Sequence, residues 1–134
     1  MSGSVARGLF CVIFTLVSFS SNAFDLNGAW TTDDSNCHKI FVTKNKKVMM
    51  TRHADVHGGG FIIEGNQIRG PAKTCKITGR KEDGGVLNVI ATCSTDIAVL
   101  GTQQVNIKIE GDDRLTRIFP SFPEMGTTYY RCKL

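Results

Sequence analysis

The 134-residue sequence lacks the short motifs that mark common enzyme classes. It contains no G-x-S-x-G nucleophile motif, no H-E-x-x-H metal motif and no phosphate-binding loop. Its adjacent carboxylates, Asp33–Asp34 and Asp112–Asp113, fall in turn-forming stretches, where carboxylates usually cap backbone amides. We therefore predict a protein that is not an enzyme and has no cofactor.

Dense basic stretches and long apolar stretches are also missing from most of the chain. Beyond the short run Lys44–Lys47 the basic residues are scattered, whereas nucleic-acid binding calls for a basic stripe with interleaved aromatics. Past the N-terminal region, no segment approaches the ~20 apolar residues of a membrane-spanning helix. No stretch has helical apolar periodicity. We expect no nucleic-acid partner, no membrane span after leader removal, and a monomer.

Residues 1–23 have the three parts of a secretory signal peptide. A short n-region carries Arg7, an apolar segment runs from Leu9 to Phe19, and Ser21-Asn22-Ala23 supplies small residues at positions −3 and −1 of a cleavage site. A membrane-anchoring N-terminal helix is the alternative interpretation. Cleavage after Ala23 leaves residues 24–134, a single domain of 111 residues (134 − 23). The sequence therefore predicts a secreted or periplasmic protein.

The cysteine pattern agrees with export. The mature chain keeps Cys37, Cys75, Cys93 and Cys132, an even number that suits an oxidising compartment. Their spacing is too scattered for a zinc site of the CxxC type. We expect two disulfides, either Cys75–Cys93 with Cys37–Cys132 or the rival pairing Cys37–Cys75 with Cys93–Cys132.

The stretch from Lys73 to Ser94 has the pattern of a long β-hairpin. Two strand-like runs flank Glu82-Asp83-Gly84-Gly85, where the glycines can adopt the positive φ angles of a tight turn. Paired residues in an antiparallel hairpin share a constant sum of residue numbers, and a turn centred on Gly84 pairs Cys75 with Cys93. This register favours the first disulfide pairing. The second run also alternates, with Leu87, Val89, Ala91 and Cys93 on one face.

Strand signals recur along the rest of the mature chain. Short alternating runs are separated by turns, and Gly65-Asn66 is a strong hairpin signal. The pattern predicts an all-β fold, a small antiparallel meander that closes into an eight-to-ten-stranded barrel or sandwich. The expected strands are 26–30, 37–43, 47–51, 61–64, 67–69, 73–81, 86–94, 103–110, 114–119 and 127–132, with an irregular mobile loop at 52–60.

Three residues carry a family resemblance. Gly28 and Trp30 form a G-x-W motif in the first strand, and Arg131 lies in the last. This arrangement resembles the calycin superfamily, which includes lipocalins, avidins and small bacterial metalloprotease inhibitors. The resemblance implies a barrel in which an arginine of the last strand packs over the tryptophan, a contact that suits a planar guanidinium.

The run Leu26–Trp30, followed by Cys37, is most similar to the metalloprotease-inhibitor branch. Those inhibitors insert an N-terminal segment into the protease cleft. In this chain only residues 24–27 would precede Gly28 after cleavage, so the sequence departs from that mechanism.

Two further stretches are candidates for binding. His53, Asp55 and His57 have the spacing of metal ligands if they lie on one face of a strand, but ordinary loop polarity is the default and we predict no metal. The segment 118–125 holds two prolines and two phenylalanines, and a rigid apolar loop of this kind either caps the barrel or makes a contact surface. In the second case its binding residues would be Phe119, Pro120, Phe122 and Pro123.

Two functions follow from these observations. The favoured one is a protein-binding module, for example an inhibitor of a secreted or periplasmic hydrolase, because eight-stranded barrels are just wide enough to be filled by side chains. The alternative is a barrel that binds a small apolar ligand. A cavity above roughly 300 Å³ would favour the alternative.

Overall fold

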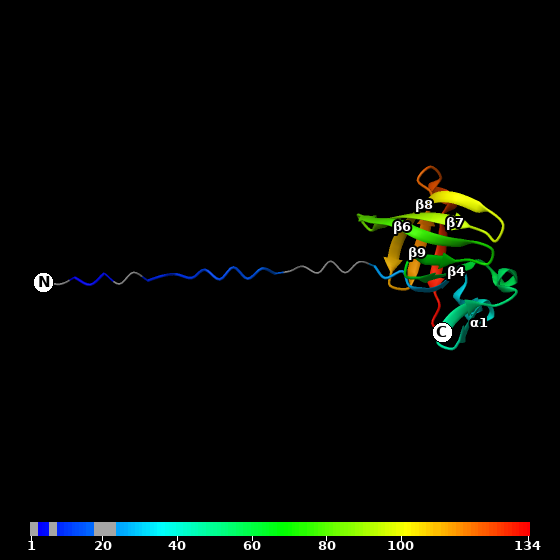
Figure 1. Cartoon of the computed structure of the whole chain (residues 1–134), viewed down its shortest axis with the longest axis horizontal. Helices are drawn as coiled ribbons and strands as arrows, with labels where there is room; N and C mark the ends of the chain where they lie inside the picture. The colour runs from blue at the N-terminus through cyan, green and yellow to red at the C-terminus, as the bar shows by residue number, and fades with distance from the viewer. Residues whose placement is uncertain (1–2, 6–7, 18–23) are drawn as a thin grey trace.

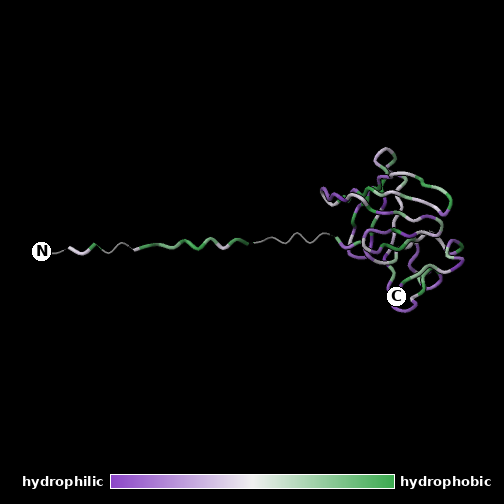
Figure 2. The backbone as a smooth tube through the Cα atoms, in the orientation of Figure 1, coloured by the Kyte–Doolittle hydropathy of each residue, from purple (hydrophilic) through white to green (hydrophobic). Residues whose placement is uncertain are grey.

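The computed structural model describes residues 3–5, 8–17 and 24–134. Residues 3–5 and 8–17 form neither helix nor strand, and the apolar segment 8–17 extends away from the barrel (Figures 1 and 2). The cleavage site predicted at Ser21-Asn22-Ala23 lies outside the described residues. In the part of the chain described, no helix is long and apolar enough to cross a membrane.

The predicted all-β fold is confirmed: eight antiparallel strands form a closed barrel in the order β1-β10-β9-β8-β7-β6-β5-β4. From β4 to β10 the chain is a simple meander, and β1 closes the barrel by pairing with both β4 and β10. The strands are β1 (Gly28–Thr31), β4 (Gly60–Glu64), β5 (Gln67–Arg69), β6 (Thr74–Asp83), β7 (Val86–Ser94), β8 (Val99–Gly111), β9 (Arg114–Ile118) and β10 (Thr127–Arg131).

The segment between β1 and β4 forms a small cap outside the barrel. It contains η1 (Asp34–Asn36), α1 (Cys37–Ile40), the two-stranded sheet of β2 (Phe41–Lys44) and β3 (Lys47–Met50), and η2 (Ala54–His57). Its apolar residues pack against the outward-facing Ala29 of β1 and Ile62 of β4. The cap therefore has its own hydrophobic cluster, separate from the barrel interior.

Two secondary-structure predictions in this cap were wrong. The strand predicted over 37–43 begins as the helical turn α1, because Cys37 and Ile40 are both buried and lie three residues apart, on one side of a helical turn. The irregular loop predicted over 52–60 contains η2 and the first residue of β4, and Ala54 within η2 is buried. In both segments, packing of buried side chains against the outer face of β1 and β4 determines the local structure.

The long β6–β7 hairpin has the predicted cysteine pairing but a different turn. Cys75 lies opposite Cys93, whereas at the tip Asp83 lies opposite Val86 around the glycines 84 and 85, both with positive φ. A β-bulge between Ile77 and Gly79 shifts the register by one residue and reconciles the two ends. The bulge also places Arg80 opposite the buried Val89.

The barrel is filled at one end. Its buried residues come from opposite sides of the barrel, and Trp30, with no exposed surface, lies at their centre. The inward face of β7 follows the alternation expected from the sequence. The cluster consists of Leu26, Trp30, Ile63, Leu87, Val89, Ile107 and Leu115.

Candidate functional site

The predicted disulfide pairing Cys75–Cys93 with Cys37–Cys132 is confirmed, and the rival pairing is wrong. Cys75 and Cys93 bridge neighbouring strands at a Cα–Cα distance of 4.0 Å and face the barrel interior with Ala91. Cys37–Cys132 joins α1 to the residue after β10, across 95 positions of sequence. Both bridges fit an oxidising environment.

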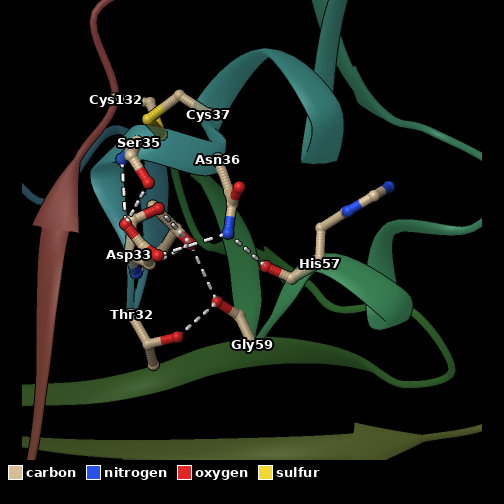
Figure 3. The surroundings of a disulfide bond; sticks show 9 residues. Thr32, Asp33, Ser35, Asn36, Cys37, His57, Gly59 and Cys132 are labelled. Carbon is tan, nitrogen blue, oxygen red and sulfur yellow. Dashed lines mark hydrogen bonds between the residues drawn. A yellow bond between two sulfur atoms is a disulfide. The ribbon is translucent and has the colours of Figure 1, made fainter.

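The surroundings of Cys37–Cys132 show how the cap is held on the barrel (Figure 3). Asn36 Nδ2 donates to the carbonyl of His57 at 3.0 Å, and the Thr32 amide donates to the carbonyl of Gly59 at 3.0 Å. These bonds join the beginning of the cap, just after β1, to its end, just before β4.

Asp33 caps the first turn of the cap. The hydroxyl of Ser35 and then its backbone amide donate to the Asp33 carboxylate, and these bonds lower the pKa of Asp33. A lowered pKa means that the bonds stabilise the fold above the ordinary aspartate pKa and are lost as the pH falls through the folded-state value.

Arg131 closes the filled end of the barrel. Its Cζ lies 4.3 Å from the centroid of the Trp30 ring and 5.9 Å from that of Phe24. A Cβ placed on Gly28 would lie 3.1 Å from the Arg131 guanidinium, and Gly28 has a φ of +136°. The contact therefore requires both the absence of a side chain at position 28 and a backbone conformation that favours glycine.

The guanidinium also donates hydrogen bonds to backbone carbonyls that lie outside the barrel strands. Its Nη2 donates to the Asp25 carbonyl at 2.7 Å and to the Asp112 carbonyl at 3.0 Å, and its Nη1 donates to the Asn27 carbonyl. Arg80 donates to the carbonyl of Phe24 from the other side. The segment 24–27 is thereby tied across this end of the barrel.

Replacing Arg131 with Met should lower the free energy of unfolding by about 2–3 kcal/mol, because hydrogen bonds from a charged donor contribute about 1.5–3 kcal/mol and Met keeps much of the packing. Chemical denaturation of the oxidised mature protein measures the change. The matched control is Arg114→Met, which removes an exposed ion pair with Glu110 at 3.3 Å and should cost less than about 1 kcal/mol. Equal losses in the two variants would contradict a closing role for Arg131.

The other end of the barrel is open and contains an apolar cavity of about 390 Å³. The walls come from six strands and from the loop between β5 and β6, so the cavity lies inside the barrel. The buried Leu115, Ile107 and Ile63 belong both to its wall and to the filled core. The lining residues are Gly60, Phe61, Ile63, Ile68, Gly70, Pro71, Ala72, Lys73, Cys75, Ile107, Leu115, Arg117 and Tyr129.

This cavity overturns the expectation that side chains would fill the barrel. Sequence patterns mark which residues face inward, but they do not show how far those side chains reach across the interior. The signal that was available is the small size of several lining residues near the β5–β6 loop, namely Gly70, Pro71 and Ala72.

A second hollow, of about 620 Å³, lies at the closed end and has a different character. Its carboxylates Asp25, Glu82, Asp112 and Asp113 are exposed to solvent. Asp112 and Asp113 lie in the β8–β9 turn, and Asp113 already forms ion pairs with Arg131 and Lys133, so no ligand is needed to explain them. The open end is therefore the stronger candidate for a binding site.

The first of the two candidate binding stretches in the sequence does not form a metal site. His53, Asp55 and His57 do not share a strand face, because His53 precedes η2 and the other two lie within it. Among the described residues, no group of three or more His, Cys, Asp or Glu is arranged to hold a metal ion.

The segment 119–125 is a solvent-exposed loop with a short helical turn, η3 (Pro123–Met125). Phe122 is 56% exposed and Met125 60% exposed, and Pro120 and Pro123 are also exposed. Phe119 is half-buried, and Arg117 Cζ lies 4.9 Å from the centroid of its ring. The loop follows directly on a wall of the cavity, since Arg117 is a lining residue.

No family model, curated protein or solved structure matches this chain. The eight-stranded antiparallel barrel is compatible with a calycin-like architecture, and the function must be inferred from the geometry of its open end.

Proposed function

We propose that this protein is a non-enzymatic carrier that binds a small apolar molecule in the open end of its barrel. The observation that supports the proposal is the apolar cavity of about 390 Å³. Sites for small molecules are concave, mostly apolar and typically about 300–1,000 Å³ in volume. The cavity meets each of these criteria.

The closed end of the barrel stabilises the fold, and the open end contains the proposed binding site. At the closed end, Trp30, Leu26 and Arg131 hold the strands together without help from a ligand. At the open end, the disulfide Cys75–Cys93 ties β6 to β7 beside the cavity. A wall fixed in this way favours binding because little conformational freedom remains to be lost.

We further propose that the protein acts outside the cytoplasm, as a secreted or periplasmic protein. The two disulfides suit such a compartment, and the sequence of residues 1–23 has the organisation of a leader. The oxidised mature protein is therefore the form to use in binding experiments.

Filling the cavity should abolish binding of an uncharged apolar probe. In the variant Ile68→Trp, the larger side chain occupies space that the probe needs, since Ile68 lines the cavity. The affinity for phenylnaphthylamine should fall at least about tenfold, because each CH₂ removed from water contributes about 0.8 kcal/mol. Fluorescence titration measures the affinity, and a thermal melt verifies that the variant is folded.

The matched control is Ile90→Trp, the same substitution at a position that is 42% exposed and not part of the cavity. It should bind the probe like the wild type. If the wild-type protein failed to bind the probe, or if both variants bound it unchanged, the cavity would not be the binding site.

A protein-binding role is the second candidate, and the exposure of Phe122 and Met125 favours it. Exposed apolar side chains on a loop stiffened by two prolines can contact a partner with little entropic cost. The variant Ile68→Trp separates the two roles. A partner protein captured equally well by wild type and Ile68→Trp would support docking on the loop, because that substitution leaves the loop unchanged.

A further inference from the structure

The cavity contains two cationic residues among otherwise uncharged ones. Arg117 and Lys73 both line it, from β9 and from the β5–β6 loop. Neither Arg117 nor Lys73 takes part in an ion pair within residues 3–5, 8–17 and 24–134. The cationic residues that do so are Arg69, Arg114, Arg131 and Lys133. No carboxylate oxygen of the described chain lies within 4.0 Å of either cationic group.

The register of β9 places Arg117 on the inner wall. Arg117 lies opposite Ile107 of β8 and opposite Thr127 of β10, and it is two residues from the buried Leu115. Because alternate residues of a strand face the same side, Arg117 shares the interior face with Leu115. Its guanidinium lies against the Phe119 ring, which holds the side chain near the mouth of the cavity.

Tyr129 adds a hydrogen-bond donor to the same wall. It lies opposite Leu115 and therefore diagonally next to Arg117, within reach of a long side chain. Its ring packs edge-on against Phe61 at 4.9 Å between centroids. Among the side-chain hydrogen bonds of the described residues, none involves the Tyr129 hydroxyl or the Arg117 guanidinium.

Lys73 brings positive charge from a different part of the mouth. It is exposed on the short connection between β5 and β6, where the Gly70 amide donates to the Lys73 carbonyl at 2.8 Å and fixes the turn. Lys73 and Arg117 therefore belong to separate elements, a loop and a strand, that line the same cavity.

A partly buried cation beside apolar surface is costly unless an anion accompanies it. A guanidinium binds carboxylate, sulfate or phosphate oxygens through two parallel hydrogen bonds, and such charge-assisted bonds are among the strongest in proteins. We propose that the ligand is an acidic amphiphile, with a short apolar body in the cavity and one anionic group held by Arg117, assisted by Lys73 and Tyr129. This inference rests on the proposed carrier function.

Two fluorescent probes with the same aromatic skeleton test the proposal. Phenylnaphthylamine is uncharged, whereas anilinonaphthalene sulfonate carries one sulfonate. In the variant Arg117→Gln, the dissociation constant of the sulfonate probe should rise about tenfold or more, as expected when a charge-assisted hydrogen bond is lost. The dissociation constant of the uncharged probe should stay within about twofold of the wild-type value.

The control is Arg114→Gln, the same substitution on the same strand. Arg114 is exposed and is not part of the cavity, so neither probe should be affected. Lys73→Gln provides a second test on a surface loop. It should raise the dissociation constant of the sulfonate probe alone, about threefold or more, because one charge near the anion is removed. Melting temperatures verify that the variants are folded.

The outcomes separate the two proposals. If wild type binds the uncharged probe but Arg117→Gln and Lys73→Gln bind the sulfonate probe as tightly as wild type, the acidic-ligand inference is wrong and the carrier function stands. If wild type fails to bind the uncharged probe, the carrier function itself fails. A selective loss of the sulfonate probe in both variants, with Arg114→Gln unchanged, supports the inference.

Discussion

Replacing both Cys37 and Cys132 with Ser should lower the free energy of unfolding by about 4–5 kcal/mol. The bridge closes a loop of 95 positions, and the loss of unfolded-chain entropy on closing a loop grows with the logarithm of its length. Domains of this size are stable by only about 5–15 kcal/mol, so this loss is roughly a third or more of the total stability.

The second disulfide provides the comparison. Cys75–Cys93 closes a loop of 18 positions, and its replacement by two serines should cost about 3 kcal/mol. Urea denaturation of both double variants, with circular dichroism as the signal, measures the two losses. A larger loss for the shorter loop would contradict the entropic argument and would mean that packing beside the cavity dominates.

Replacing Trp30 with Ala should lower the free energy of unfolding by about 3–5 kcal/mol. Trp30 has no exposed surface, it packs at the centre of the barrel core, and its Nε1 donates to the Leu26 carbonyl at 2.9 Å. The substitution leaves a cavity and an unpaired carbonyl, and it removes the ring on which Arg131 lies. Circular dichroism must report unfolding here, because Trp30 is the only tryptophan.

The exposed Ile97 is a suitable control for Trp30→Ala. It is 95% exposed in the loop between β7 and β8, and Ile97→Ala should change stability by no more than about 0.5 kcal/mol. Trp30→Phe keeps an aromatic ring and should be intermediate. A loss below about 1 kcal/mol in Trp30→Ala would show that the closed end does not depend on this residue.

Local patterns predicted the features of the barrel that depend on neighbouring residues. Gly65-Asn66 and Gly84-Gly85 lie at the tips of hairpins, where Gly65, Gly84 and Gly85 have positive φ. The alternation from Leu87 to Cys93 matches the buried face of β7. A turn and a period of two are properties of short stretches, so the sequence suffices to recognise them.

Predictions failed where distant parts of the chain decide the local structure. The segment 37–43 was predicted to be a strand, but contact with the outer face of β1 and β4 and the bridge to Cys132 hold Cys37–Ile40 in a helical turn. The bulge near Thr78 was also missed. Gly79 in the strand interior is a local signal for a bulge, but the one-residue shift is fixed only by the register at both ends of the long hairpin.

The sequence by itself determined the all-β class, the two hairpin turns, the four cysteines that pair and the residues Gly28, Trp30 and Arg131 at the closed end. Only the tertiary structure decided that the opposite end is open and that Arg117, Lys73 and Tyr129 line one cavity. The reason is geometric. Whether side chains from six strands meet across a barrel depends on their lengths and on the register of every strand at once, and no single stretch of sequence contains that information.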